Sequence, residues 1–304
     1  MFVVGRFRPC RAHLGEFRLR RPEFSLELAA PGAQQLPIAM LIHVVTIRSV
    51  LHNCRQASHA KDDPVNHDNP STLVVIPTYN ERESLPSLVE ALLAVEPGIA
   101  ILVVDDGSPD GTGEYVDDLA RTEPRIAIIH RTAKEGLGPA YIAGFRWALE
   151  RDFTVIVEMD ADGSHQVEAL PDLLKAVTDG AALAIGSRWV PGGRIVNWPK
   201  YRQAISRTGT AYARILLRSK LHDITSGYRA FTRAALESVD LDSLSAQGYA
   251  FQIELAWRVE RQGLTVTEVP ITFVERAFGR SKMTTRIVVE ALAKVTQWGI
   301  RGPR

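Results

Sequence analysis

Two carboxylates one residue apart, Asp160 and Asp162, directly follow an apolar run from Phe153 to Met159. The run predicts a buried strand, and open α/β sheets bind ligands at the carboxyl ends of their strands. Carboxylate oxygens suit Mg²⁺ or Mn²⁺, whose coordination is often completed by substrate phosphates. The pair therefore predicts a divalent-metal site in an enzyme that handles a nucleoside diphosphate, although a solvated turn would also explain such a motif standing alone.

Polar segments also follow the two strands predicted nearest the start of the regular pattern, at residues 77–81 and 105–112. An aspartate at such a strand end can accept hydrogen bonds from a nucleotide base or a ribose hydroxyl. Asp, Ser and Gly equally favour helix N-caps and turns. We expect both uses: Asp110 or Thr112 caps the following helix, and Asp106 faces the ligand.

Composition excludes several classes of protein. The chain has 304 residues, 45% hydrophobic content and a formal net charge of +1, which give no argument for a nucleic-acid partner. Cys10 and Cys54 are the only cysteines, so a disulfide framework or a cysteine-based metal site is not expected, and a reducing compartment fits. The longest apolar stretch, residues 36–51, is shorter than the roughly 20 residues that span a bilayer. A signal peptide fits the start of the chain poorly.

The chain divides into three parts. Residues 1–70 are basic at first and end in a polar, turn-rich linker, and we expect a disordered extension, with a basic arm that touches anionic lipid as the alternative. Residues 71–283 form the expected catalytic domain, and residues 284–304 an amphipathic helix and tail. That helix either packs on the domain or lies on a membrane surface.

Strand-like and helical patterns alternate from Thr72 onward, which predicts βαβ units. The expected fold is α/β: a mainly parallel, Rossmann-like sheet flanked by helices in a single catalytic domain. The expected strands are Thr72–Pro77, Ile99–Asp105, Ile126–His130, Thr154–Met159 and Ala181–Gly186. The expected helices are residues 83–95, 112–122, 138–151, 167–178 and 202–219, followed by a helix at 248–262, a strand pair near 265–275 and a last helix at 284–299.

Several ordered motifs together resemble the inverting family 2 glycosyltransferases of the GT-A fold, and most closely the polyprenol (dolichol) phosphate mannose synthase subgroup. The resemblance covers about residues 71–283. It rests on Val-Val-Ile-Pro-Thr-Tyr-Asn-Glu, Val-Val-Asp-Asp-Gly-Ser-Pro-Asp-Gly-Thr, Asp-Ala-Asp-Gly-Ser-His, Lys-Glu-Gly-Leu-Gly, Gly-Ser-Arg, Ile-Thr-Ser-Gly-Tyr-Arg, Phe-Gln-Ile-Glu and Gly-Arg-Ser-Lys.

The resemblance implies a role for specific residues on the donor side. Those that would contact the nucleoside are Pro77, Tyr79, Glu81, Val104 and Asp106. Those that would hold the metal and the diphosphate are Asp160, Ala161 and Asp162, with Ser164 a weak further ligand because some relatives carry Gln there. Arg280, Ser281 and Lys282 would cover the diphosphate from a closing loop.

On the acceptor side, the resemblance implies a phosphate site at Arg188, Arg202 and Ser206. Guanidinium groups bind phosphate oxygens in bidentate fashion, although Arg202 could also lie on a solvated helix face. A phosphate is largely dianionic at neutral pH and needs no general base. We therefore expect Asp162, Arg188 and Arg202 to support catalysis by positioning and charge stabilisation, with Glu254 not a base and the histidines structural.

The implied reaction moves mannose from GDP-mannose to the phosphate of a polyprenol, with inversion and with Mg²⁺ or Mn²⁺. Alternatives are another nucleotide sugar such as UDP-glucose, a catalytically silent sugar-nucleotide-binding module, or a nucleotidyltransferase. We expect a cytoplasmic protein held peripherally on the cytoplasmic face of a membrane, either directly or by a membrane-anchoring partner protein.

Overall fold

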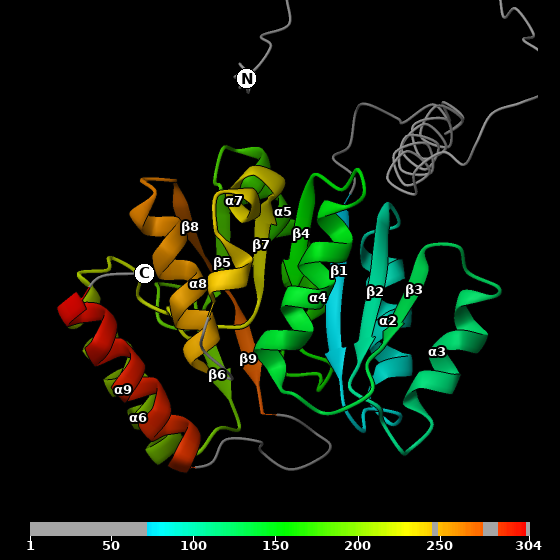
Figure 1. Cartoon of the computed structure of the whole chain (residues 1–304), viewed down its shortest axis with the longest axis horizontal. Helices are drawn as coiled ribbons and strands as arrows, with labels where there is room; N and C mark the ends of the chain where they lie inside the picture. Colours follow the sequence, from blue (N-terminus) through cyan, green and yellow to red (C-terminus); the bar gives the residue numbers. More distant parts are fainter. Residues whose placement is uncertain (1–71, 245–248, 276–284, 302–304) are drawn as a thin grey trace, which may run out of the picture. The chain divides into compact units, whose positions relative to one another are not determined.

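The computed structural model describes residues 72–244, 249–275 and 285–301. The expected N-terminal extension at residues 1–70 lies outside this part of the chain. The described residues form one seven-stranded sheet, one two-stranded sheet and the helices around them (Figure 1).

The seven-stranded sheet has the order β3-β2-β1-β4-β7-β5-β8. β7 runs antiparallel to both of its neighbours, and the other pairs are parallel. The mainly parallel α/β fold expected from the sequence is confirmed. The strands are β1 (Thr72–Thr78), β2 (Ile99–Asp105), β3 (Ile126–His130), β4 (Val155–Glu158), β5 (Leu183–Ser187), β6 (Arg194–Val196), β7 (Arg229–Thr232), β8 (Val266–Pro270) and β9 (Thr272–Val274).

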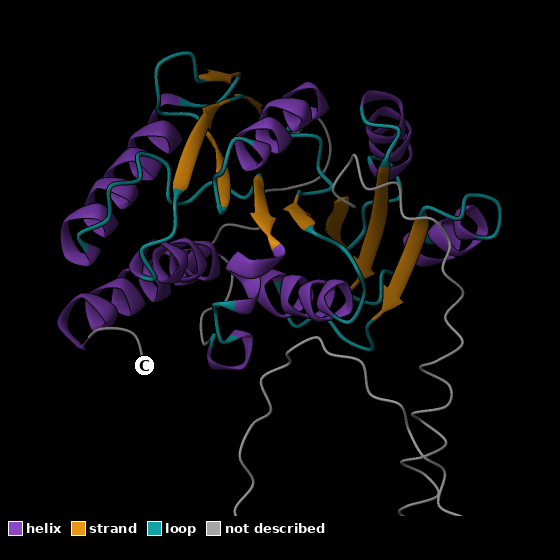
Figure 2. Cartoon of the chain, turned by 90° about the horizontal axis from the view of Figure 1, so that it is seen from above, coloured by secondary structure: helices purple, strands orange, loops and turns teal. Residues whose placement is uncertain are grey.

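Helices cover both faces of this sheet, as the view from above shows (Figure 2). The α-helices are α2 (Leu85–Val95), α3 (Thr112–Ala120), α4 (Leu137–Leu149), α5 (Leu170–Thr178), α6 (Lys200–Leu217), α7 (Arg233–Glu237), α8 (Tyr249–Arg261) and α9 (Thr285–Arg301). Two short 3₁₀ turns, Val167–Ala169 and Leu241–Ser243, complete the described helical structure.

Successive residues of β1 enter two different cores. Leu73 and Val75 pack with residues of α4 and α8, whereas Val74 and Ile76 pack with residues of α2 and α5. A parallel strand covered on both faces reads as a continuous apolar run because neither face meets water. This explains why the strands were recognisable in the sequence as uninterrupted Val, Ile and Leu.

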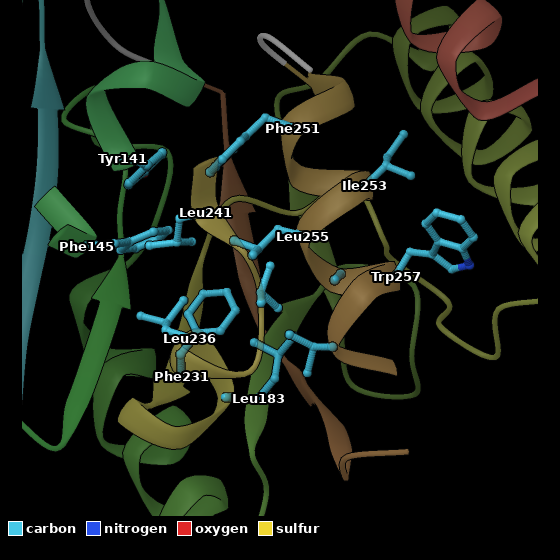
Figure 3. Packing of buried hydrophobic residues seen from close by; sticks show 14 of the residues in the cluster. Tyr141, Phe145, Leu183, Phe231, Leu236, Leu241, Phe251, Ile253, Leu255 and Trp257 are labelled. Atoms are coloured by element: carbon cyan, nitrogen blue, oxygen red, sulfur yellow. The ribbon is translucent and has the colours of Figure 1, made fainter. Parts of the chain in front are cut away.

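The core on the α4 side is rich in aromatic rings (Figure 3). Tyr141 stacks on Phe145 and on Phe251, with ring centroids 5.9 and 6.1 Å apart. Trp257 of α8 stacks on Trp298 of α9 at 6.0 Å. The last helix therefore packs on the domain through one face, as one of the two sequence interpretations held.

After residue 187, the positions and the pairing of the strands differ from those expected from the sequence. Residues 194–196 and 229–232, both expected to be loop, form β6 and β7. The expected strand pair near 265–275 exists as β8 and β9, but the two do not pair with each other. Only Ile271 separates them, too few residues for a hairpin turn, so β8 joins β5 and β9 joins β6.

Gly144 of α4 is required by the close approach of this helix to the sheet. A Cβ there would lie 2.4 Å from Cγ1 of Val75, a β-branched side chain in the middle of β1. We expect Gly144→Ala to lower the free energy of unfolding by about 1–3 kcal/mol, measured by urea denaturation. In Gly209→Ala of α6 the new Cβ meets nothing within 4 Å, and we expect a gain of roughly 0.5–1 kcal/mol. Equal stability of the two variants would contradict this packing account.

Candidate active site

The carboxyl ends of β2, β1 and β4 lie side by side, and hydrogen bonds join the ends of β1 and β2 and the loops that follow these two strands. Thr78 Oγ1 donates to Asp105 Oδ1 at 2.8 Å, and the Ser108 backbone N–H donates to Asp105 Oδ2 at 2.9 Å. The Glu81 N–H donates to Thr112 Oγ1 at 3.1 Å. Asp105 therefore has a structural role at this edge, next to the residues that the sequence predicts to bind the ligand.

The start of α3 corrects one expectation. The N-cap residue is Gly111, whose φ of 83° favours glycine, and not Asp110 or Thr112. Asp110 nevertheless accepts hydrogen bonds from the Thr112 N–H at 3.0 Å and from the Thr112 hydroxyl at 2.5 Å. Partial burial alone would raise the pKa of Asp110, but these bonds and one from the Arg82 N–H outweigh it and lower the pKa.

The residues implied for the nucleoside gather around the β1 and β2 ends. Pro77, Tyr79 and Glu81 are partly buried, and the Lys134 ammonium lies 3.8 Å from the centre of the Tyr79 ring. Val104 is fully buried, with its side chain in the core under α4. A Val104 side-chain contact with the nucleoside would therefore have to displace core packing.

Asp106 is buried and engaged within the protein. Its carboxylate accepts from Arg131 Nη1 at 2.5 Å and from the Gly136 N–H at 3.3 Å. Arg131 also pairs with Glu135. The contacts fix the loop between β3 and α4 against the strand end, so the ligand-facing role of Asp106 stays a prediction.

The segment after β4 places Asp160 and Asp162 at the same edge. Tyr141 donates a long hydrogen bond of 3.3 Å to Asp160 Oδ1, and the Ser164 N–H donates to Asp162 Oδ1 at 3.0 Å. The His165 ring accepts from the Asp160 N–H at Nδ1 and stacks on Tyr228 with centroids 5.0 Å apart. Burial lowers the pKa of His165, against the opposing effect of the two aspartates, which suits a neutral structural histidine.

A buried ion pair lies directly beneath this segment. Glu158 and Arg229 are both fully buried, with 3.9 Å between Glu158 Oε2 and Arg229 Nε. Burial raises the pKa of Glu158, Arg229 opposes this rise, and Asp160 adds to it. Arg229 also donates to the carbonyl oxygens of Gln252 and Ile224, each at 2.7 Å. β4, β7 and α8 are therefore joined under the two aspartates.

One pocket brings the predicted metal and acceptor residues together. Its walls come from the segments after β4 and after β5, from α6, the segment before β7, α8, the end of β9 and α9. The predicted residues that line it are Asp160, Asp162, Ser164, Arg188, Arg202 and Ser206. Apolar and aromatic side chains complete the wall: Trp198, Ile205, Tyr212, Ile253, Phe273, Val288, Ala291, Leu292 and Val295.

Arg188 is held by a carboxylate that the sequence interpretation did not identify. Its Nε and Nη2 donate to the two oxygens of Asp223, each at 2.7 Å, and Nη2 also donates to Thr225 Oγ1 at 3.0 Å. Asp223 is fully buried and accepts a further hydrogen bond from the Arg188 N–H. Arg188 lines the pocket as part of a fixed structural pair, and its contact with a phosphate stays a prediction.

Arg202 also has a carboxylate partner. Its Nη1 donates to Glu275 Oε1 at 2.9 Å, and both side chains line the pocket. The Arg202 side chain is 18% exposed and that of Glu275 is 32% exposed, so both meet solvent. The interpretation of Arg202 as a residue of a solvated helix face is wrong, because the guanidinium is directed into the pocket wall.

The other sequence predictions fall away from the pocket or outside the described residues. Glu254 is buried, pairs with Arg258 and does not line the pocket. His222 is exposed and pairs with Glu268. Arg280, Ser281 and Lys282 lie outside the part of the chain that the structure describes.

The paired carboxylates suit a hard divalent cation. In the described ranges, no group of three or more His, Cys, Asp or Glu side chains is placed to hold a metal ion. Mg²⁺ and Mn²⁺ sites that receive substrate phosphates need only one or two carboxylates. Asp162 is 9% exposed, and its Oδ1 is oriented by a backbone N–H, so Asp160 and Asp162 fit such a site without a third protein carboxylate.

The mainly parallel sheet has helices on both faces and carries paired carboxylates and arginines at its carboxyl edge, the arrangement expected for a GT-A glycosyltransferase. Residues 73–240, more than half of the chain, match the family described as glycosyl transferase family 2. The chain belongs to this family.

Relatives with high sequence identity belong to one subgroup. The chain is 53% identical to a polyprenol monophosphomannose synthase of Mycolicibacterium smegmatis, over 82% of this chain and 94% of that protein. It is 55% identical to an undecaprenyl-phosphate mannosyltransferase of Micrococcus luteus, over 75% and 93%. It is 39% identical to a dolichol-phosphate mannosyltransferase of Pyrococcus furiosus, over 73% of this chain and 62% of that protein.

Solved structures share the fold at low sequence identity. Glucosyl-3-phosphoglycerate synthase from Mycobacterium tuberculosis is 19% identical, with a TM-score of 0.57 over 75% of this chain and 80% of that one. The mannosyltransferase PcManGT from Pyrobaculum calidifontis, solved with GDP-Man and Mn²⁺, is 19% identical, with a TM-score of 0.52 over 75% and 65%.

We expect Asp162→Asn to lower Mn²⁺-dependent turnover by about a hundredfold, as the loss of one charge-stabilising group does in other active sites. The carboxamide retains the oxygen that accepts from Ser164, so the thermal unfolding temperature should not change. Asp172→Asn, an exposed position in the first turn of α5, is the matched control and should behave as wild type. Turnover of Asp162→Asn within a few-fold of wild type would refute the metal assignment.

Proposed function

We propose that the protein transfers mannose from GDP-mannose to the phosphate of a polyprenol, with inversion at the anomeric carbon. The observation that supports this most directly is the composition of one pocket. Its lining combines paired carboxylates, Arg202 and Ser206 with apolar side chains that come mainly from α6 and α9. A phosphate attached to a long hydrocarbon needs both a cationic and an apolar surface. The relatives at 53% and 55% identity are named for such lipid phosphates.

The chemistry requires positioning more than proton transfer. An oxygen of the dianionic acceptor phosphate attacks the anomeric carbon, and the bond from that carbon to the diphosphate breaks with its electron pair on the departing oxygen. The acceptor has no proton to remove, which agrees with the position of Glu254 outside the pocket. Arg202 and Ser206 would orient the attacking phosphate.

Asp160 and Asp162 would hold Mg²⁺ or Mn²⁺, and Ser164 remains a weak further candidate. A divalent cation bound there would neutralise the charge that develops on the diphosphate. The Mn²⁺ in the complex of the Pyrobaculum calidifontis mannosyltransferase, which has the same fold, supports this choice of cation. Pro77, Tyr79, Glu81 and Asp106 remain the candidates for the nucleoside, and Arg280 and Lys282 for the diphosphate.

A panel of radiolabelled nucleotide sugars tests the donor. With a short-chain polyprenyl phosphate and Mn²⁺, GDP-mannose is expected to give the glycolipid product, and UDP-glucose little or none. Preference for UDP-glucose would replace the donor but keep the reaction class. Nucleotide binding without turnover of any sugar would favour a silent binding module.

Arg202 tests the acceptor site. We expect Arg202→Ala to weaken use of a short-chain polyprenyl phosphate about tenfold to a hundredfold, because a charge-assisted hydrogen bond contributes about 1.5–3 kcal/mol. Binding of GDP-mannose with Mn²⁺ should be nearly unchanged, and Arg202→Lys should recover only part of the loss. Arg207→Ala, an exposed arginine on the same helix, is the control. Equal losses for donor and acceptor would make Arg202 a donor-binding or structural residue.

We further propose that the protein works peripherally on the cytoplasmic face of a membrane. In the described part of the chain, all large hydrophobic side chains that are exposed belong to three elements, β6, α6 and α9. They are Val196, Tyr201, Ile205, Ile215, Val289, Leu292 and Ile300. Ile205 and Leu292 also line the pocket, so two of these exposed residues belong to the pocket wall. None of the described helices is long and apolar enough to cross a bilayer.

The two helices form one surface. Tyr212 of α6 and Thr296 of α9 are hydrogen-bonded through their hydroxyl groups at 2.6 Å, and helical spacing places each among the exposed apolar residues of its helix. α6 carries four basic residues and no acidic one. An apolar strip bordered by basic residues suits a leaflet that contains anionic lipid.

The surface can be tested separately from catalysis. We expect Ile215→Ser/Val289→Ser/Ile300→Ser to reduce binding to vesicles that contain anionic phospholipid by about tenfold or more. Turnover with a short-chain, water-soluble acceptor should be retained, because none of the three side chains lines the pocket. Arg121→Glu, at the residue that follows α3, is the control for surface changes elsewhere. Unchanged vesicle binding would leave a membrane-anchoring partner protein as the means of attachment.

A further inference from the structure

The ion pair between Arg202 and Glu275 occupies the place proposed for the acceptor phosphate. Arg202 lies in α6 and Glu275 directly follows β9, yet both line the pocket that contains Asp160 and Asp162. The pair is made by a single hydrogen bond of 2.9 Å, and both side chains are partly exposed. An exposed pair of this kind contributes little to stability because water screens it.

Two backbone hydrogen bonds connect Val274 and Glu275 to two different neighbouring segments. The Glu275 N–H donates to the Val196 carbonyl at 3.0 Å, and the Val274 N–H donates to the Ser164 carbonyl at 3.2 Å. These bonds join the position to β6 and to the segment that carries Asp162. The Glu275 carboxylate is therefore held at the pocket by its backbone, whether or not its side chain contacts Arg202.

Three carboxylates and two guanidinium groups line the pocket. The carboxylates belong to Asp160, Asp162 and Glu275, and the guanidinium groups to Arg188 and Arg202. Arg188 is already neutralised by the buried Asp223 through two hydrogen bonds. Arg202 has a partly exposed carboxylate partner, so a phosphate that binds this guanidinium competes with Glu275 for its charge.

We propose that Glu275 competes with the phosphate for Arg202 and so weakens the binding of both acceptor and product, which favours release of the product. The inference rests on the proposed function. Transfer converts a phosphomonoester of charge about −2 into a phosphodiester of charge −1. The guanidinium attracts the monoester more strongly than the diester. The substrate displaces Glu275, and the carboxylate returns to Arg202 once the charge of the phosphate has fallen.

Glu275→Gln tests the competition, because it retains the size of the side chain and removes its charge. We expect the KM for short-chain polyprenyl phosphate and the inhibition constant of its mannosyl phosphodiester product each to fall about three- to tenfold. The KM for GDP-mannose should stay the same. Initial rates with added product measure all three, and Glu275→Asp, which keeps the charge, should remain close to wild type.

Two controls separate competition from a structural role. Glu237→Gln removes the carboxylate of another Arg–Glu pair, on α7, and should change none of the constants. In an Arg202→Ala background, Glu275→Gln should no longer improve acceptor use, since its effect passes through Arg202. An acceptor KM that rises or stays constant in Glu275→Gln, with normal turnover by the wild type, would overturn this inference alone. Absence of any mannosyl transfer by the wild type would overturn the proposed function and the inference together.

Discussion

Negative charge at the carboxyl edge of the sheet is the constraint on which the rest of the structure depends. Parallel strands bring their carboxyl ends together, and here they bring Asp106, Glu158, Asp160 and Asp162 to one edge. A donor diphosphate and an acceptor phosphate would add further anions. Carboxylates in a partly desolvated site repel one another and require compensation. Arg131 provides it for Asp106 and Arg229 for Glu158.

The arginine that lies beside Glu158 also connects elements of the fold. Arg229 lies in the one strand that runs antiparallel within the sheet, and its guanidinium reaches the carbonyl of Gln252 on α8. The Arg229 guanidinium, which lies beside Glu158, therefore joins the sheet to α8. Removing either partner of such a buried pair would leave an uncompensated charge. The position of Asp160 thus depends on residues far from it in the sequence.

The apolar part of the site comes from the close approach of α6 and α9. Gly299 allows it, since a Cβ there would lie 2.9 Å from the Leu216 carbonyl oxygen. On its other side α9 is fixed to α8 by the stacked Trp257 and Trp298. One helix surface is therefore used for packing, while Val289 and Ile300 on the opposite surface remain exposed. The last helix therefore packs on the domain and also presents exposed apolar side chains, and its contact with a membrane stays a proposal.

The parts of the site that lie in one local segment were predictable from the sequence. Asp160 and Asp162 end an apolar run, so their place at a strand end followed from periodicity alone. Alternation along β2 directs the side chain of Val103 into one core and that of Val104 into the other, so the nucleoside contact that the resemblance implies for Val104 stays a prediction. β7 was missed because it is only four residues long and begins with a buried arginine. A charged residue in a central strand is stable only with a partner, Glu158, that local patterns do not reveal.

The partners of the two pocket arginines could not be predicted for the same reason. Asp223 is 35 residues from Arg188, and Glu275 is 73 residues from Arg202. Arg188 and Arg202 differ in how deeply they and their carboxylate partners are buried. Arg188 is 7% exposed beside a carboxylate with no exposure, and its guanidinium forms two hydrogen bonds with that carboxylate. Arg202 makes one bond to a carboxylate that is 32% exposed. Breaking the first pair would leave a buried charge, whereas breaking the second returns a carboxylate to water. The proposed exchange of a carboxylate for a phosphate therefore concerns Arg202 and not the buried pair of Arg188.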